Sequence, residues 1–370
     1  MSQELKRTEL YQWHVDHGAR MVPFAGWEMP VQYPTGPIEE HHATRRSAGL
    51  FDIDHMGQIT VIGPDAEDYL NRLVTWDIRL MGDNEAHYAL MCYDHGGIVD
   101  DVFVYKLAGR WFVVVNASNL AKVYHWMQDH AQGYDVTFKN VSDETYMLAL
   151  QGPNAVDLLQ KLVQTDLANV ARFNALETEV SGVSAIIGRT GYTGEDGVEL
   201  FFPAEAALHV WESILNTGAA VGIEVRPIGL AARDSLRFEP SFPLYGHEIS
   251  ADISPIEANL SWACKFDTDF IGKEALLKQK ETGVTKKLIG FELTEKGVPR
   301  PDYSVTTETG QPIGTVVTGL YAPTVNKYCG HAFVFPAYAT VGTSLKIIIR
   351  DKPKAAIVVK RPFYVPTYRR

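Results

Sequence analysis

Two stretches of the chain share one pattern of apolar and polar positions. Residues 59–78 and residues 148–167 each hold a short apolar run, a Gly-Pro break and then apolar side chains spaced three or four residues apart. Such a run followed by such a spacing predicts a strand that leads into an amphipathic helix. Aligned without gaps, the two stretches are identical at eight of twenty positions. The pattern therefore predicts two related α+β units.

The rest of the chain divides at about Lys286. Ahead of this point, strands are predicted at 98–105, 111–116, 183–189 and 198–202, and helices at 204–216 and from Ile228 onward. Beyond it, short apolar segments alternate with Gly and Pro turns over about 85 residues, which favours a separate small β-barrel or sandwich. The lysine-rich stretch 273–287 is predicted to be a helical link into that region.

Composition and charge exclude several classes of protein. With 370 residues, 46% of them hydrophobic, the chain is long enough for two or three globular domains. Its net charge of −11 would repel phosphate backbones, so we expect no nucleic-acid partner. Neither a signal peptide nor a membrane span is evident, and the three cysteines lack disulfide or zinc spacing. We therefore expect a soluble, cytoplasmic protein without a bound metal.

The first motif with chemical potential is GGIVDD at 96–101, where two glycines open a turn and two carboxylates enter an apolar strand. Side chains alternate along a strand, so Asp100 and Asp101 should face opposite sides. One of them should face an interior or a cleft, where a carboxylate must be paired or have a shifted pKa. The alternative is a turn that carries a solvated pair of aspartates.

The second motif, RTGYTGEDG at 189–197, has a glycine at every third position and is followed by Glu199 between apolar residues. Closely spaced glycines allow a tight turn or a close approach to a ligand. It lacks the spacing of a dinucleotide-binding loop. A glycine-rich hairpin without a ligand is the alternative.

The third motif places Arg233 and Arg237 four residues apart on a predicted helix. Two guanidinium groups on one helix face attract anions, either carboxylates of the protein or those of a ligand. The spacing alone leaves both possibilities open.

In combination, these motifs give the chain a resemblance to the glycine cleavage T-protein family along nearly its whole length. The stretches that carry it are GARMVPFAGWEMP (18–30), GLFDIDHM (49–56), GGIVDD (96–101), QGP (151–153), RTGYTGEDG (189–197), ARDSLRFE (232–239), LYG (244–246), DFIGK (269–273) and KRPFY (360–364). The chain departs from the family pattern at Pro23, Asp54, Arg172 and Ala231.

The resemblance implies an α+β fold with three domains around a central opening. We assign the first domain, which is discontinuous, to residues 1–50 and 145–280, the second to 51–144, and a C-terminal β-barrel to 286–370. The resemblance also implies that tetrahydrofolate is the acceptor and that the lipoylated H-protein of the glycine cleavage system is the donor of an aminomethyl group, with ammonia released. The enzyme would be an aminomethyltransferase.

The resemblance further implies the roles of seven residues. Asp101 matches the catalytic carboxylate, and the positions of folate contact are matched by Tyr88, Asn116, Tyr192, Glu199, Arg233 and Arg369. We hypothesise that basic residues near the C-terminus help to hold H-protein, namely Lys286, Lys287, Lys352, Lys354, Lys360, Arg361, Arg369 and Arg370.

Two other functions are compatible with these residues. One is a tetrahydrofolate-dependent demethylase that acts on a small N-, O- or S-methyl donor and needs no carrier protein. The other is a folate-binding protein without activity. Asp101 argues against the second, because binding alone does not require that carboxylate.

Overall fold

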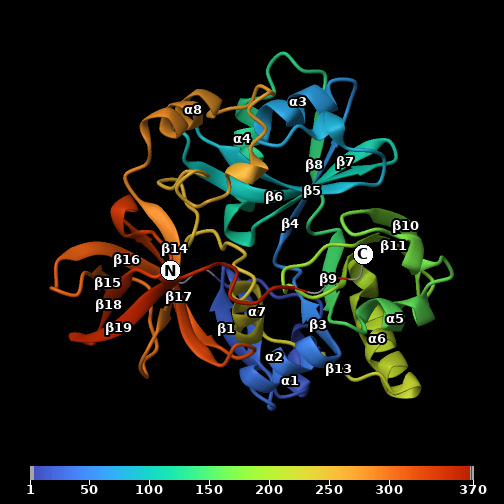
Figure 1. The fold of residues 1–370 in the computed structure, drawn as a ribbon. Helices are drawn as coiled ribbons and strands as arrows, with labels where there is room; N and C mark the ends of the chain where they lie inside the picture. Colours follow the sequence, from blue (N-terminus) through green and yellow to red (C-terminus); the bar gives the residue numbers. More distant parts are fainter. Residues whose placement is uncertain (1–3, 367, 369–370) are drawn as a thin grey trace.

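The strands of the chain form a six-stranded sheet, a five-stranded sheet and a closed barrel (Figure 1). The computed structural model describes residues 4–366 and residue 368. The six-stranded sheet has the order β10 (Ala175–Val180), β11 (Val183–Gly188), β12 (Gly197–Pro203), β9 (Thr145–Gln151), β3 (Ala48–Asp52) and β13 (Val225–Pro227). The five-stranded sheet has the order β5 (Ala86–Cys92), β6 (Ile98–Leu107), β7 (Arg110–Val115), β4 (Gly57–Ile62) and β8 (Thr137–Asn140).

The barrel and the helices complete the architecture. Around the barrel the strands are β14 (Lys287–Leu293), β17 (Lys327–Val334), β16 (Pro312–Ala322), β15 (Ser304–Thr306), β18 (Ser344–Ile349) and β19 (Lys352–Val359). A hairpin of β1 (Arg20–Phe24) and β2 (Trp27–Gln32) lies near the N-terminus. The helices are α1 (Tyr11–Asp16), α2 (Pro37–Arg46), α3 (Ala66–Leu73), α4 (Leu120–Asp129), α5 (Ala155–Leu159), α6 (Ala207–Val221), α7 (Leu230–Phe238) and α8 (Lys273–Thr282).

The α+β class and the C-terminal barrel predicted from the sequence are confirmed. The four strands expected ahead of the barrel correspond to β6, β7, β11 and β12, and the two expected helices to α6 and α7. The lysine-rich link forms α8, which ends at Thr282, before the first barrel strand. Within residues 4–366 and 368, no helix combines the length and the apolar character needed to cross a membrane.

The repeated pattern forms the same structure twice, as β4 with α3 and as β9 with α5. Gly63 and Gly152, which occupy the same position in the two copies, share a φ of +131°. In each, a Cβ would lie 2.3 Å from a backbone carbonyl oxygen, so only glycine fits. The second helix is shorter than the pattern predicts. Beyond Leu159 the chain continues as a 3-10 turn over Gln160–Leu162, and the Gln160 side chain hydrogen-bonds to the backbone of the following loop from Val163 to Leu167.

The predicted domain limits remain a proposal, which the sheet order supports. The six-stranded sheet takes its strands from residues 48–52 and 145–227, whereas all strands of the five-stranded sheet lie within 57–140. Each sheet has its own apolar core, with Trp211 buried in the first and Tyr69 in the second.

Helix α7 is held against the barrel by a buried cluster of charges. It contacts α2, β2 and β16, and it lies between the barrel and the two sheets (Figure 1). The Arg237 guanidinium of α7 donates to Glu248 Oε2 at 2.9 Å, and His331 of β17 bonds to Glu248 Oε1 at 2.9 Å. Burial alone would raise the pKa of Glu248, but the charge of Arg237 and the bond from His331 hold it well below its usual range.

A second cluster surrounds Glu239, the residue after α7. Arg45 of α2 donates to Glu239 at 2.9 Å and to Glu195 at 2.9 Å, and Glu239 also accepts from the Thr324 backbone at 2.7 Å. Burial raises the pKa of Glu239, but the hydrogen bond from His41 and the charge of Arg45 lower it to about 2. Two ion clusters that are shielded from water, one at Glu248 and one at Glu239, therefore fix the C-terminal part of α7 and the residue after it.

The Glu239 cluster should make stability depend on pH. A carboxyl with an ordinary pKa of 4.5 and a folded-state pKa of about 2 adds stability that is complete above pH 4.5 and is lost as pH falls toward 2. We expect Glu239→Gln to lower the free energy of unfolding at pH 7 by on the order of 3 kcal/mol. The variant should then lose less stability than the wild type between pH 7 and pH 3. Urea unfolding followed by circular dichroism measures both.

Glu295→Gln is the matched control, because Glu295 pairs with Lys354 at 2.9 Å at the exposed surface of the barrel. It should leave the pH dependence close to that of the wild type, since an exposed pair contributes little. If the wild type and Glu239→Gln lose the same free energy of unfolding between pH 7 and pH 3, Glu239 is not the source of this pH dependence.

Candidate functional site

A cavity of about 430 Å³ lies where the two sheets meet α7 and the loops that follow it. Six of the seven residues proposed from the resemblance line it, namely Tyr88, Asp101, Asn116, Tyr192, Glu199 and Arg233. The seventh, Arg369, lies outside the described residues. The six come from β5, β6, the end of β7, the loop ahead of β12, β12 itself and α7. Residues that are far apart in the sequence thus converge on one space.

Asp101 is held in the cavity by two hydrogen-bond donors. The Asn116 amide donates to Asp101 Oδ1 at 2.6 Å, and the Tyr88 hydroxyl donates to Oδ2 at 3.1 Å. Leu90 and Asp101 are register partners on β5 and β6, which brings Tyr88 beside the carboxylate. Both carboxylate oxygens therefore have a fixed donor, and the group is oriented before any ligand binds.

Asp100 faces the other side of β6, as the strand alternation predicts, and is completely buried. Its oxygens accept from the Asn116 backbone at 3.1 Å and from the side chains of Asn116 at 2.8 Å and Asn119 at 2.5 Å. The Asn116 amide therefore joins the two aspartates, and the alternative of a solvated pair is wrong.

Burial raises the pKa of both aspartates above the ordinary carboxyl range. For Asp100 the charge of Asp101 raises it further, and the bonds from Asn116 and Asn119 oppose the rise. For Asp101 the bonds from Asn116 and Tyr88 oppose the effect of burial. The pair thus binds a proton more readily than free aspartates do, and its donors decide how far its ionised form persists at neutral pH.

Glu199 occupies another wall of the cavity on β12. The Thr190 hydroxyl donates to Glu199 Oε2 at 2.5 Å, and the Tyr105 hydroxyl donates to the same oxygen at 3.4 Å. Burial raises the pKa of Glu199, which Thr190 and the charge of Arg233 oppose. Because both bonds reach Oε2, Oε1 is left to accept from a ligand.

The two arginines of the third motif have different roles. Arg237 is bound by Glu248 and by Asp234, at 2.8 Å, so it belongs to the protein's own ion cluster. The Arg233 guanidinium lines the cavity and lies 5.0 Å from the centre of the Tyr192 ring. Among residues 4–366 and 368, no carboxylate lies within ion-pair distance of Arg233. Arg233 is therefore the one of the two that is available to a ligand.

Several residues of the cavity were not assigned a role from the sequence. Trp262 is 58% exposed at the cavity and stacks on Tyr88 with ring centroids 5.6 Å apart. Arg172 lies over the rings of Phe173, at 4.4 Å, and Tyr368, at 3.4 Å. A lone tryptophan gives no sequence signal, whereas Arg172 is a departure from the family pattern. Within the described part of the chain, no cluster of three potential metal ligands is found.

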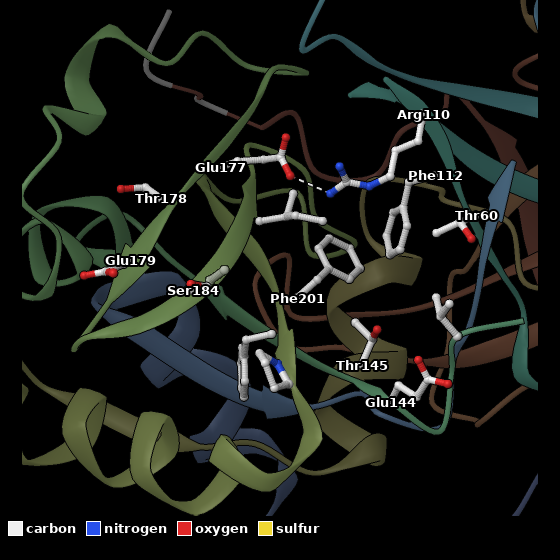
Figure 2. Close-up of a pocket in the computed structure, with 15 residues that line it drawn as sticks. Thr60, Arg110, Phe112, Glu144, Thr145, Glu177, Thr178, Glu179, Ser184 and Phe201 are labelled. Carbon is white, nitrogen blue, oxygen red and sulfur yellow. Dashed lines mark hydrogen bonds and ion pairs between the residues drawn. The ribbon is translucent and has the colours of Figure 1, made fainter. Parts of the chain in front are cut away.

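A larger hollow of about 640 Å³ is lined by β4 and β7 of one sheet and by β9, β10, β11 and β12 of the other (Figure 2). Phe112 and Phe201 line it, and an ion pair from Arg110 to Glu177 at 2.5 Å lies at its edge. Its carboxylates are exposed to solvent, as the 64% exposure of the Glu144 side chain illustrates. It lacks the buried acids and the unpaired guanidinium of the cavity that contains Asp101, Glu199 and Arg233 (the inner cavity). The inner cavity is therefore the better candidate.

Comparison with known proteins gives two family matches that together span most of the chain. Residues 10–268 match the GCVT N-terminal domain, and residues 286–364 match the glycine cleavage T-protein C-terminal barrel domain. The interval between the two matches contains α8.

Relatives of similar length are found among curated proteins and solved structures. The chain is 49% identical to an aminomethyltransferase of Desulforamulus reducens, over 98% of this chain and 99% of the relative. It is 46% identical to that of Caldanaerobacter subterraneus subsp. tengcongensis, over 99% and 98%. The crystal structure of the glycine cleavage system aminomethyltransferase T from Bartonella henselae superposes with a TM-score of 0.92 at 32% identity, over 98% of this chain and 99% of that one.

The Tyr88 hydroxyl should control the titration of Asp101. Tyr88→Phe removes a hydrogen bond that stabilises the ionised carboxylate and should therefore raise the pKa of Asp101. A bond to a charged group contributes about 1.5 kcal/mol, so the midpoint should move up by about 1 on the pH scale. Carbon-13 NMR of aspartate-labelled protein measures the titration, and Asp101→Asn identifies the signal.

Tyr105→Phe serves as the control. Tyr105 is a buried tyrosine on β6 that bonds to Thr190 and Glu199 rather than to Asp101. It should leave the Asp101 midpoint in place. An unchanged midpoint in Tyr88→Phe would mean that this bond does not stabilise the carboxylate.

Proposed function

The chain belongs to the glycine cleavage T-protein family and is an aminomethyltransferase of the glycine cleavage system, and we propose that its inner cavity binds tetrahydrofolate and that Asp101 is the catalytic carboxylate. The observation that carries the proposal is the convergence of Asp101, Glu199 and an unpaired Arg233 on one enclosed space. Its volume of about 430 Å³ lies in the range of small-molecule sites.

The cavity residues fit the chemistry of a folate. The pterin edge presents adjacent N–H donors, which Glu199 Oε1 can accept. Flat rings pack on aromatic side chains such as Tyr192 and Phe103, both of which line the cavity. The folate tail carries carboxylates, for which an unpaired guanidinium such as Arg233 is the matching partner. Arg369 is proposed for the same tail and lies outside the described residues.

In the proposed reaction, the donor is an aminomethyl group attached through sulfur to the lipoyl arm of H-protein. Its carbon loses its bonds to sulfur and to nitrogen and gains two bonds to folate nitrogens. The two protons that leave those folate nitrogens go to the sulfur, which becomes a thiol, and to the amine, which leaves as ammonia. Atoms and charge balance without an oxidant or a reductant.

Asp101 has two tasks in this scheme. The transferred carbon passes through a state with positive charge, which an ionised carboxylate in a water-poor cavity stabilises. The bonds from Asn116 and Tyr88 fix the carboxylate, so that it also orients the acceptor nitrogen. A demethylase with a small methyl donor is disfavoured, because relatives named aminomethyltransferase match this chain over almost its entire length.

H-protein is the proposed partner, and the basic residues near the barrel are its proposed docking surface. Lys352 and Lys360 are exposed at the two ends of β19. Lys354 is less available, because it pairs with Glu295, and Lys286 donates to the Asp252 backbone at 3.1 Å. Local positive charge of this kind would offset the net charge of −11 for an acidic carrier.

We also propose a cytoplasmic location. Cys92, Cys264 and Cys329 are all buried and unpaired. Unpaired thiols are the usual state in a reducing compartment, which supports this location.

Asp101→Asn should separate catalysis from binding. The amide keeps the shape of the side chain but removes the charge, so turnover should fall roughly 10²-fold or more. Tetrahydrofolate should still raise the melting temperature, because Glu199 and Arg233 are untouched. Assays with aminomethyl-lipoyl H-protein, together with thermal shift, measure the two effects. Near-normal turnover would remove Asp101 from the mechanism.

Charge reversal at Lys352 and Lys360 should weaken docking of H-protein. In the variant, we expect the KM for H-protein to rise severalfold while the thermal shift caused by folate stays unchanged. In the wild type, the KM for H-protein should rise as the salt concentration rises. Lys161→Glu is the matched control, since Lys161 is exposed in the turn that follows α5, away from the barrel. Turnover with a small methylated donor and none with loaded H-protein would contradict the proposed donor.

A further inference from the structure

His55 lies in the turn between β3 and β4 and lines the inner cavity. The turn is closed by a hydrogen bond from the Met56 backbone to the Ile53 carbonyl at 3.0 Å. The imidazole is 4% exposed and meets the edge of Phe24 with ring centroids 5.4 Å apart. In the sequence, His55 is distinguished only by its place in the GLFDIDHM stretch at 49–56.

The other buried histidines of the described chain use both ring nitrogens. His14 bonds to Asp52 and to the Tyr33 hydroxyl, and His41 bonds to Ser235 and Thr324. His331 bonds to Glu248 and Ser241. His55 differs, because its Nδ1 is buried without a partner among residues 4–366 and 368. No hydrogen bond to its Nε2 is found among those residues either, so this cavity-lining ring has no partner within the described protein.

The protonation state of His55 follows from its surroundings. Burial, together with the charge of Arg233, lowers the pKa of His55 to about 3, so the ring is neutral at neutral pH and one nitrogen carries the hydrogen. A buried N–H without an acceptor is rarer than a buried lone pair without a donor. We therefore place the hydrogen on Nε2, which, unlike Nδ1, is not among the buried atoms without a partner.

The turn is anchored on both sides of His55. Asp52 accepts from Thr8 at 2.7 Å and bonds to His14 at 2.8 Å, and both interactions are shielded from water. Asp54 accepts from the Met147 backbone at 3.1 Å. A side chain held this firmly is positioned before a ligand arrives, which limits the entropy lost on binding.

We propose that His55 is a binding residue of this site, which donates from Nε2 to an acceptor oxygen of bound folate beside the Arg233 guanidinium. The inference rests on the proposed folate site. The neutral donor and the cationic donor together would recognise an oxygen that carries partial or full negative charge. The pterin carbonyl and a tail carboxylate share this chemistry.

Three substitutions test the proposal by tetrahydrofolate binding, measured by calorimetry. His55→Phe keeps an aromatic ring but removes both nitrogens, and it should weaken binding about tenfold. His55→Gln places an amide near the position of Nε2 and should recover part of that loss, whereas His55→Asn, whose amide lies near Nδ1, should not. His209→Phe, the same change at an exposed histidine outside the cavity that bonds to the Ser181 carbonyl, should bind as the wild type does.

The stability of the ligand-free protein separates binding from structure. His55→Phe removes a buried nitrogen that lacks a partner, so its melting temperature should equal or exceed that of the wild type. A fall in melting temperature that parallels the loss of binding would indicate a structural role and overturn the proposal. Equal affinity of wild type and His55→Phe for tetrahydrofolate would overturn it as well.

A tetrahydropterin without the tail identifies the acceptor. If His55→Phe also weakens tetrahydropterin binding, the acceptor is the pterin carbonyl. If it weakens only the binding of full tetrahydrofolate, the acceptor is a tail carboxylate, and either result supports the proposal. Failure of the wild-type protein to bind tetrahydrofolate would overturn the proposed folate site and this inference with it, whereas normal wild-type binding that His55→Phe retains overturns this inference alone.

Discussion

The buried bond between Arg237 and Glu248 positions the helix on which the cavity depends. Glu248 also holds His331 of the barrel, so one carboxylate links α7 to β17. Arg233 lies one helical turn before Arg237, and its guanidinium can remain unpaired in the cavity because the following arginine fixes the helix. A break in such an ion cluster leaves an uncompensated charge in the interior, which strongly disfavours any displaced position of α7.

Several polar groups of the cavity lack a partner within the described protein. Asp101 faces the cavity and Asp100 the other side of β6, and the Asn116 amide donates to both carboxylates. His55 has a nitrogen without a partner, and Arg233 has no carboxylate within the described residues. Elsewhere, buried ions such as Glu239 are matched by partners. Unmatched groups that gather in one space are typical of a site formed for a ligand.

The sequence predicted the classes of element better than their extents or their roles. Strand alternation correctly placed Asp100 and Asp101 on opposite faces, because that periodicity is local. Helical spacing could not tell that Arg237 serves the protein and Arg233 faces the cavity, because the partner Glu248 comes from a loop beyond the helix. The spacing also did not show that α5 passes into a 3-10 turn at Gln160. The stacking of Trp262 on Tyr88 joins segments about 170 residues apart, a tertiary contact that no local pattern encodes.

The order of the strands has a consequence for synthesis on the ribosome. β3 pairs with β9 and with β13, so the six-stranded sheet cannot close until residue 227 has emerged. All five strands of the other sheet lie within residues 57–140 and can assemble earlier. For the time needed to translate the intervening chain, β3 leaves the exit tunnel with its apolar side chains and both of its edges without partners. During synthesis the five-stranded sheet can therefore be complete while β3 is still unpaired. β3 is then the segment that a ribosome-associated chaperone would have to cover.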